Sequence, residues 1–129
     1  MNNKEKDYMN YYSSSFNLSK WNVSKVKTFD SMFQSTALKE INLTGWKPSA
    51  CSNFSWIFYM CESLKELRMS ASFTIPSNAS VQGCFSKVTS CTVYPAMSSE
   101  MDTLKKTLKT MKFSGQRNTL TIMQLSVKC

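Results

Sequence analysis

The stretch from Phe16 to Glu40 reads FNLSKWNVSKVKTFDSMFQSTALKE, and the stretch from Ile41 to Glu66 reads INLTGWKPSACSNFSWIFYMCESLKE. Both end in Leu-Lys-Glu, and their aromatic residues recur after 25 positions: Trp21 as Trp46, Phe29 as Phe54 and Phe33 as Phe58. A looser third stretch begins at Leu67, and a fourth opens at Cys91. Self-similarity at a fixed spacing indicates a repeat architecture, so the chain is predicted to be a short series of stacked units.

Each unit opens with an alternation of apolar and polar residues, which is typical of a short strand with one buried face. The apolar residues of the four openings are Phe16 and Leu18, Ile41 and Leu43, Leu67 and Met69, and Cys91 and Val93. Strands separated by about 25 residues cannot pair as tight hairpins. We therefore expect them to lie parallel, joined by crossovers.

The second half of each unit is predicted to return as a helical or 3₁₀-like arc with one face in the core. In the first unit its apolar residues are Val23, Val26, Phe29, Met32 and Phe33. The recurring aromatic residues, Trp21 and Trp46 among them, are also expected in the core. Trp56 and Tyr59 have polar counterparts in the first unit, so an exposed position open to a partner is the alternative for these two.

A unit built of strand, bend, arc and bend is typical of a leucine-rich solenoid. The predicted fold is α/β: a short right-handed leucine-rich-repeat solenoid with a parallel sheet and a C-terminal helix-strand cap. Residues 1–15 are interpreted as an N-terminal arm or a partial capping repeat. The repeats are expected to span 16–95, as units 16–40, 41–66 and 67–90 and a fourth strand at 91–95.

Residues 96–129 are predicted to form the cap. Its helix is expected to begin near Ser98 and to end at Gly115, because acidic residues in the first turn suit the helix dipole and glycine favours a helix end. The apolar stripe of this helix is Met101, Leu104, Leu108 and Met111. A last strand, rich in β-formers and bulged near Met123 and Gln124, is expected to extend the sheet.

The sequence resembles the BspA-like leucine-rich repeat of bacterial surface proteins. The resemblance rests on NLSKWNVSKV at 17–26, on Ser-Met-Phe at 31–33 and on the Cys-x-x-Leu element from Cys61 to Leu64. It is good over 16–66 and weak over 67–95. The resemblance implies a non-catalytic module for protein recognition, of the kind used in adhesion or recruitment on a cell surface.

Composition argues against an enzyme. The chain has no histidine, which removes Ser-His-Asp and Cys-His arrangements, and its three glycines are too far apart for a phosphate-binding loop. No cofactor and no metal site are expected. Glu40 and Glu66 are the acidic pair at matching repeat positions, and we expect them on bends as surface charges.

The five cysteines are interpreted as small buried apolar residues, with a Cys84–Cys91 bridge or a metal site as alternatives.

No apolar run is long enough for a membrane-spanning helix. The first residues lack the apolar stretch of a secretory signal. Family resemblance therefore indicates a surface or secreted location, whereas the missing signal leaves the cytoplasm open.

The net charge is +8, and from Thr103 onward there are six basic residues and no acidic one. The interpretations are a solvated face or a patch for nucleic acid, an anionic lipid surface or an acidic protein. The residues of this candidate basic patch are Lys105, Lys106, Lys109, Lys112 and Arg117.

A solenoid commonly binds its partner on the sheet-lined face, where outward residues of successive strands form rows. The rows expected from the alternation are Asn17, Asn42, Arg68, Thr92 and Thr121, with Ser19, Thr44, Ser70 and Tyr94 beside them. Arg68 and Tyr94 are the expected anchors, because Arg and Tyr are enriched among binding hot spots. The predicted function is protein recognition. An intracellular interaction or inhibitor protein, or a binder of nucleic acid or anionic surfaces, is the alternative.

Overall fold

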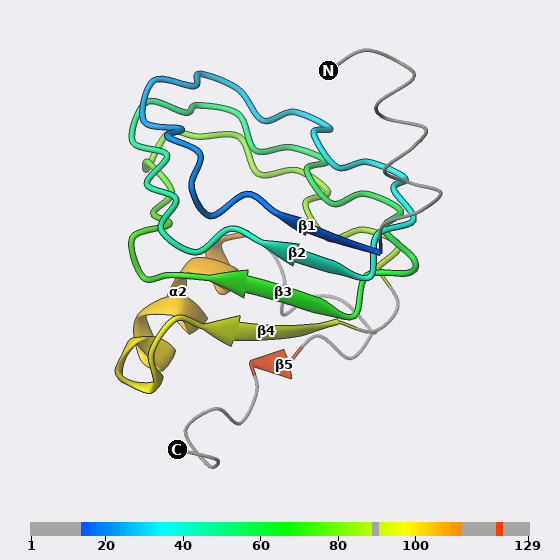
Figure 1. Ribbon diagram of the computed structural model, residues 1–129. Helices are drawn as coiled ribbons and strands as arrows, with labels where there is room; N and C mark the ends of the chain where they lie inside the picture. Colours follow the sequence, from blue (N-terminus) through cyan, green and yellow to red (C-terminus); the bar gives the residue numbers. More distant parts are fainter. Residues whose placement is uncertain (1–13, 89–90, 112–120, 123–129) are drawn as a thin grey trace.

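The computed structural model describes residues 14–88, 91–111 and 121–122 of the 129-residue chain. Five short strands form one parallel sheet in the order β1-β2-β3-β4-β5, so each strand pairs with the next one along the sequence (Figure 1). Their bounds are Ser15–Asn17 for β1, Glu40–Asn42 for β2, Glu66–Met69 for β3, Thr92–Pro95 for β4 and Thr121–Ile122 for β5. The parallel sheet and the α/β class are confirmed.

The strand register matches the predicted openings for the first three units and differs for the fourth. Phe16 lies opposite Ile41, which lies opposite Leu67, but Leu67 lies opposite Val93 and not opposite Cys91. The predicted alignment of the fourth strand was therefore wrong by two residues. An alternating pattern cannot separate these registers, because a shift of two leaves every side chain on the same face.

The return arms are built of turns, so the helical form of the predicted arc was wrong, whereas bonds with the i→i+3 spacing of its 3₁₀-like form do occur. The amide groups of Phe29, Ser31 and Phe33 donate to carbonyl oxygens of the next unit, over 2.8–3.0 Å. These amides alternate with local bonds such as that from Met32 to the carbonyl of Phe29, at 3.0 Å. A helix would need the same amide groups for its own ladder. Their use between units therefore makes the arm a second hydrogen-bonded side of the stack.

The core lies between the sheet and the return arms and runs through all the units as one apolar cluster. Phe33, Phe58 and Phe85 form a column in it, with ring centroids 5.6 and 5.2 Å apart. Trp46 is fully buried as predicted, whereas Trp21 is 50% exposed, so that prediction was wrong. Trp46 packs against the unit before it, and among the described residues none forms such a unit before Trp21.

Two other apolar residues of the first return arm lie nearer the surface than predicted. Val26 is half-buried and Met32 is 36% exposed, while Val23 is buried with the phenylalanines. Trp56 and Tyr59 are half-buried and pack edge to face, with ring centroids 5.1 Å apart.

A helical segment closes the β4 end of the stack. A 3₁₀ turn, η1 (Ser98–Glu100), leads into α2 (Met101–Thr110), which Figure 1 shows near the C-terminal ends of β3 and β4. The predicted stripe is confirmed for Leu104, Leu108 and Met111, which all join the core. A Glu100 side-chain oxygen accepts the amide hydrogen of Ala71 at 3.1 Å. Gly115 and the bulge near Met123 lie outside the described residues.

The described cysteines are buried, as predicted, and all are free thiols: Cys51, Cys61, Cys84 and Cys91. The alternative bridge between Cys84 and Cys91 is therefore not formed. Burial raises the pKa of both thiols to about 12, because a thiolate would lose its hydration in the core. Cys129 lies outside the described residues.

Candidate functional site

The side of the sheet that faces away from the core carries two rows of polar side chains, because residues alternate between core and solvent along a strand. One row is Asn17, Asn42, Arg68 and Tyr94, and the other is Ser15, Glu40, Glu66 and Thr92. We call these eight residues the exposed sheet face. Arg68 and Tyr94, expected in different rows, are direct neighbours here.

Arg68 lies on β3 in this face and contacts one side chain of its own strand and one of β4. Its guanidinium carbon lies 4.7 Å from the centroid of the Tyr94 ring, in cation–π geometry. Its Nη2 lies 3.5 Å from Oε2 of Glu66, two residues earlier on the same strand. The side chain remains 43% exposed. The guanidinium is thus held in place and still accessible.

Glu40 and Glu66 begin β2 and β3, so the prediction that they lie on bends was wrong. They face each other across the two strands in direct register. A hydrogen bond between the two carboxyl groups, together with the repulsion of their charges, raises the pKa of Glu40 above its usual value. The Arg68 guanidinium acts in the opposite direction. One cation thus faces two carboxyl groups at this part of the face.

Asn17 and Asn42 hold the turns that follow β1 and β2. The Oδ1 atom of Asn17 accepts the amide and hydroxyl hydrogens of Ser19, at 3.0 and 2.7 Å. Oδ1 of Asn42 does the same for Thr44, at 3.0 and 2.6 Å. Such turns fix the side-chain amide of each asparagine. Ser19 and Thr44, both predicted to contact a partner, are therefore engaged with their own chain.

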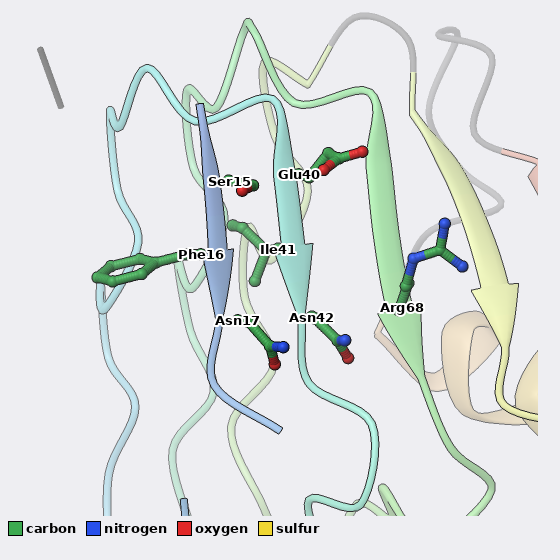
Figure 2. Close-up of a pocket in the computed structure, with 7 residues that line it drawn as sticks. All are labelled: Ser15, Phe16, Asn17, Glu40, Ile41, Asn42 and Arg68. Atoms are coloured by element: carbon green, nitrogen blue, oxygen red, sulfur yellow. The ribbon is translucent and has the colours of Figure 1, made fainter. Parts of the chain in front are cut away.

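A pocket of about 190 Å³ lies over the first three strands. Figure 2 shows Asn17 and Asn42 side by side at one end of it and Ser15 and Glu40 at the other. The Arg68 side chain lies on its β3 side, with the guanidinium turned toward β4 (Figure 2). The pocket thus offers polar groups of both kinds, hydrogen-bond donors and acceptors, to a partner.

The remaining predicted contact residues divide into three cases. Ser70 is buried, 8% exposed, and its hydroxyl accepts the amide hydrogen of Gly45 at 2.7 Å, so it does not lie on the exposed sheet face. Thr92 does lie on it, but opposite Glu66 and not opposite Arg68. Thr121 lies opposite Thr92 in the backbone register, and its side chain is outside the described residues.

Glu40, Glu66 and Ser15 belong to the face but were not among its predicted residues. The signal that finds them is the alternation itself, because each stands two positions before a residue that was predicted to point outward.

Of the candidate basic patch, Lys105, Lys106 and Lys109 are exposed on α2. Lys112 and Arg117 lie outside the described residues, so the structure brings three of the five together.

The described part of the chain holds no group of three or more Cys, Asp or Glu side chains placed to bind a metal ion. Within the same residues, no helix has the combined length and apolar character that crossing a bilayer requires.

Comparison with known proteins places the chain in a family. A model of the family described as "Mycoplasma protein of unknown function, DUF285" matches residues 4–98, which include strands β1 to β4 and the whole exposed sheet face. No curated protein and no solved structure matches the chain. Because the match covers well over half of the 129 residues, the chain belongs to the DUF285 family.

Proposed function

We propose that this protein is a non-catalytic recognition module that binds a partner protein on its exposed sheet face, with Arg68 and Tyr94 as anchors. The architecture in this proposal is a short right-handed solenoid of the BspA-like leucine-rich repeat type. Its role would be adhesion or recruitment at a cell surface, which is the role that the BspA-like resemblance implies.

The solenoid interpretation is supported by hydrogen bonds on both sides of the stack. Parallel strands pair on one side, and isolated bridges join Thr28, Asn53 and Ser80 on the other. Each unit thus contacts chiefly its neighbours, which is the property that defines a solenoid. Such a stack presents a continuous sheet surface, suited to a partner that spans several units.

The Arg68–Tyr94 contact is the observation that carries the proposal. Arginine and tyrosine are both enriched among residues that dominate binding energy. An exposed arginine normally loses rotamer freedom when it binds, and this loss reduces affinity. Here the Tyr94 ring and the Glu66 carboxylate restrict the guanidinium before any partner arrives. A pre-positioned cation beside an aromatic ring suits a partner that presents a carboxylate or a carbonyl oxygen.

The turns held by Asn17 and Asn42 support the proposal that the exposed sheet face binds a partner. Since the Oδ1 atoms of Asn17 and Asn42 are engaged by Ser19 and Thr44, each amide is held with its nitrogen available as a donor. Within the described residues, neither Nδ2 group donates to a protein atom. Together with Arg68, these groups form a row of donors across three neighbouring strands, which lie about 4.8 Å apart.

The experiment compares two variants that each remove one positive charge. Proteins that bind the immobilised wild-type chain are identified, and their affinities are then measured for Arg68→Ala and for Lys25→Ala, which changes an exposed lysine away from the face. Arg68→Ala is expected to weaken binding about 30-fold and Lys25→Ala to leave it unchanged. Equal affinities for both variants and the wild type would contradict the role of this face.

A second candidate function rests on α2, where Lys105, Lys106 and Lys109 are all exposed. A cluster of exposed lysines attracts nucleic acid or an anionic surface, and such binding weakens steeply as salt rises. Retention on heparin at low salt, lost in a variant with all three lysines changed to glutamine but kept in Arg68→Ala, would favour this function over the first.

A further inference from the structure

The β1 end of the stack leaves apolar side chains uncovered whose counterparts are buried one unit later. Trp21 is 50% exposed, Met32 is 36% exposed and Val26 is half-buried. Twenty-five positions on, the matching residues are at most 1% exposed: Trp46, Ile57 and Cys51. Figure 1 shows the return arm of the first unit, in light blue, as the outermost of the stacked arms. Among the described residues, its apolar outer side therefore lacks the cover that it gives the second unit.

The same end carries a row of backbone acceptors that is filled in the following units. In the second unit, carbonyl oxygens on alternate residues accept amide hydrogens of the first unit over 2.8–3.0 Å, and these are the carbonyls of Asn53, Ser55 and Ile57. The third unit accepts from the second in the same way, through Ser80, Gln82 and Cys84. The matching residues of the first unit are Thr28, Asp30 and Met32, all exposed. Within the described residues, no group donates a hydrogen bond to any of their three carbonyl oxygens.

Open acceptors on alternate residues suit an extended polypeptide. A chain laid beside them can donate every second amide, as an added strand does at a free sheet edge. The phosphates of a lipid or nucleic-acid surface are acceptors and cannot fill this row. The Trp46 site shows what else is needed, since its indole finds a carbonyl oxygen at Leu18 and a stacked ring at Phe29 in the unit before it. A peptide backbone with an apolar side chain supplies such groups to Trp21.

The charge of this end favours an acidic partner. Lys20 and Lys27 are both exposed here. At the matching positions of the second unit stand two uncharged residues, Gly45 and Ser52. The Asp30 carboxylate is turned to the second unit, where its Oδ2 accepts a hydrogen from Nδ2 of Asn53 at 3.3 Å. A second copy of the chain has a net charge of +8 and would bring like charges to this end, which argues against self-association there.

We propose that the β1 end of the stack binds an extended, acidic segment of a partner protein. The segment adds to the first return arm, donates its backbone amides to the carbonyl oxygens of Thr28, Asp30 and Met32, and covers the Trp21 ring. Its carboxylates lie near the two lysines. Because the core separates the return arms from the sheet, this surface is distinct from the exposed sheet face and is tested independently of it.

The probe is an acetylated peptide of about ten residues in which Glu and Val alternate, so that the extended chain carries carboxylates on one side and apolar groups on the other. Binding is followed through the backbone amide resonances of residues 26–32 in the full chain. We expect saturable shifts, with an affinity that Trp21→Ala lowers about tenfold because a central aromatic contact is lost. Met97→Ala changes a side chain that is 59% exposed beyond β4 and should leave the affinity unchanged. Equal affinities for these two variants would overturn the proposal.

A second pair of variants tests the charge. Lys20→Gln combined with Lys27→Gln should weaken binding of the acidic peptide about fivefold at low salt. Lys65→Gln combined with Lys87→Gln removes the same charge from exposed positions elsewhere and should keep the affinity within about twofold of the wild type. A peptide with Lys in place of every Glu should bind at least about tenfold more weakly. Equal binding of the two peptides would contradict an acidic partner.

Two further analogues test the backbone contact. N-methylation at every Val, or at every Glu, removes the amide donors from one edge of the extended peptide, and at least one of these analogues should lose binding. Unchanged binding of both would overturn the proposal, as would the absence of binding by the parent peptide at about 1 mM. A dimer of the chain that Trp21→Ala dissociates would assign this end to a second copy and would also overturn it.

Discussion

The indole Nε1 of Trp46 donates a hydrogen bond to the carbonyl oxygen of Leu18, 28 residues earlier in the chain, at 2.8 Å. Its ring stacks on Phe29 of the same preceding unit, with centroids 5.2 Å apart. Trp46 thus joins two successive units through both its polar and its apolar parts. The repeat position of Trp46 is occupied in the first unit by Trp21, which is half exposed.

Trp46→Phe should therefore destabilise the protein, and Trp21→Phe should not. The first change removes a buried hydrogen bond and leaves space beside Phe29, at a cost of about 1–3 kcal/mol. Urea unfolding followed by circular dichroism measures both variants. Similar midpoints for the two would contradict the role of Trp46 as a link between units.

Gly83→Ala should be strongly destabilising because two effects act at one position. The φ angle of Gly83 is 63°, and an added Cβ would overlap the Trp56 ring. Left-handed backbone costs an alanine about 1 kcal/mol, and the overlap costs a further 1–3 kcal/mol or so. The free energy of unfolding measures the sum, and a shift in tryptophan fluorescence reports the displaced ring.

Gly45→Ala is the matched control for this substitution. Its φ angle is 85°, but the nearest atom to an added Cβ is the carbonyl oxygen of Ser19 at 3.5 Å, an ordinary contact. Only the backbone cost of about 1 kcal/mol is expected there. In a Trp56→Ser background, the free-energy cost of Gly83→Ala should fall to the same value as that of Gly45→Ala, because the overlapping ring is gone. An undiminished effect in that background would show that Trp56 is not the obstacle.

The buried thiols should resist alkylation in the folded protein. The pKa values of Cys84 and Cys91 are raised to about 12 by burial, so thiolate is scarce at pH 8. In a Cys129→Ser variant, thiol titration at pH 8 should detect reaction only after denaturant is added. Rapid reaction of the native chain would contradict the burial of these residues.

The same pKa shifts predict a loss of stability in alkaline solution. These thiols keep their protons in the folded state to about pH 12, whereas the unfolded chain releases them near the usual value of 9.0. The unfolded state therefore binds fewer protons above pH 9, and the free energy of unfolding falls as the pH rises. A Cys84→Val variant should show a weaker fall between pH 9 and 11.

Glu40→Gln should raise Tm at pH 7 and have little effect near pH 4. The carboxyl group of Glu66 raises the pKa of Glu40 in the folded chain, so the folded state is penalised as Glu40 loses its proton. Glutamine removes this penalty where Glu40 is charged and changes little where it is protonated. Thermal unfolding at the two pH values tests the difference. An equal Tm shift at both would count against the proton shared with Glu66.

Much of this fold could be predicted from the sequence, because the residues that define its strands recur at a fixed spacing. The openings at Phe16, Ile41 and Leu67 marked the strands, since alternation and a fixed spacing are both local signals. The register of the fourth strand was missed because Cys91-Thr-Val and Val93-Tyr-Pro alternate in the same way. For the same reason, the neighbouring positions of Arg68 and Tyr94 emerged only from the structure.

The return arms were harder to predict. Their turns place Ser31, Trp56 and Gly83 at equivalent positive φ angles of 60°, 61° and 63°. A tryptophan there gives no sequence signal for left-handed backbone, because the conformation is imposed by bonds to the neighbouring units. The exposure of Trp21 was missed for a related reason, since burial depends on the presence of a preceding unit and not on residue type.

Cross-strand nuclear Overhauser effects in the full chain test the stacked register most directly, since the exposed sheet face depends on it. The structure predicts contacts between the Arg68 side chain and the Tyr94 ring, with upfield shifts of the Arg68 methylene protons, and contacts between Leu67 and Val93. Contacts that instead pair Arg68 with Thr92, or none between β3 and β4, would contradict the register and the face built on it.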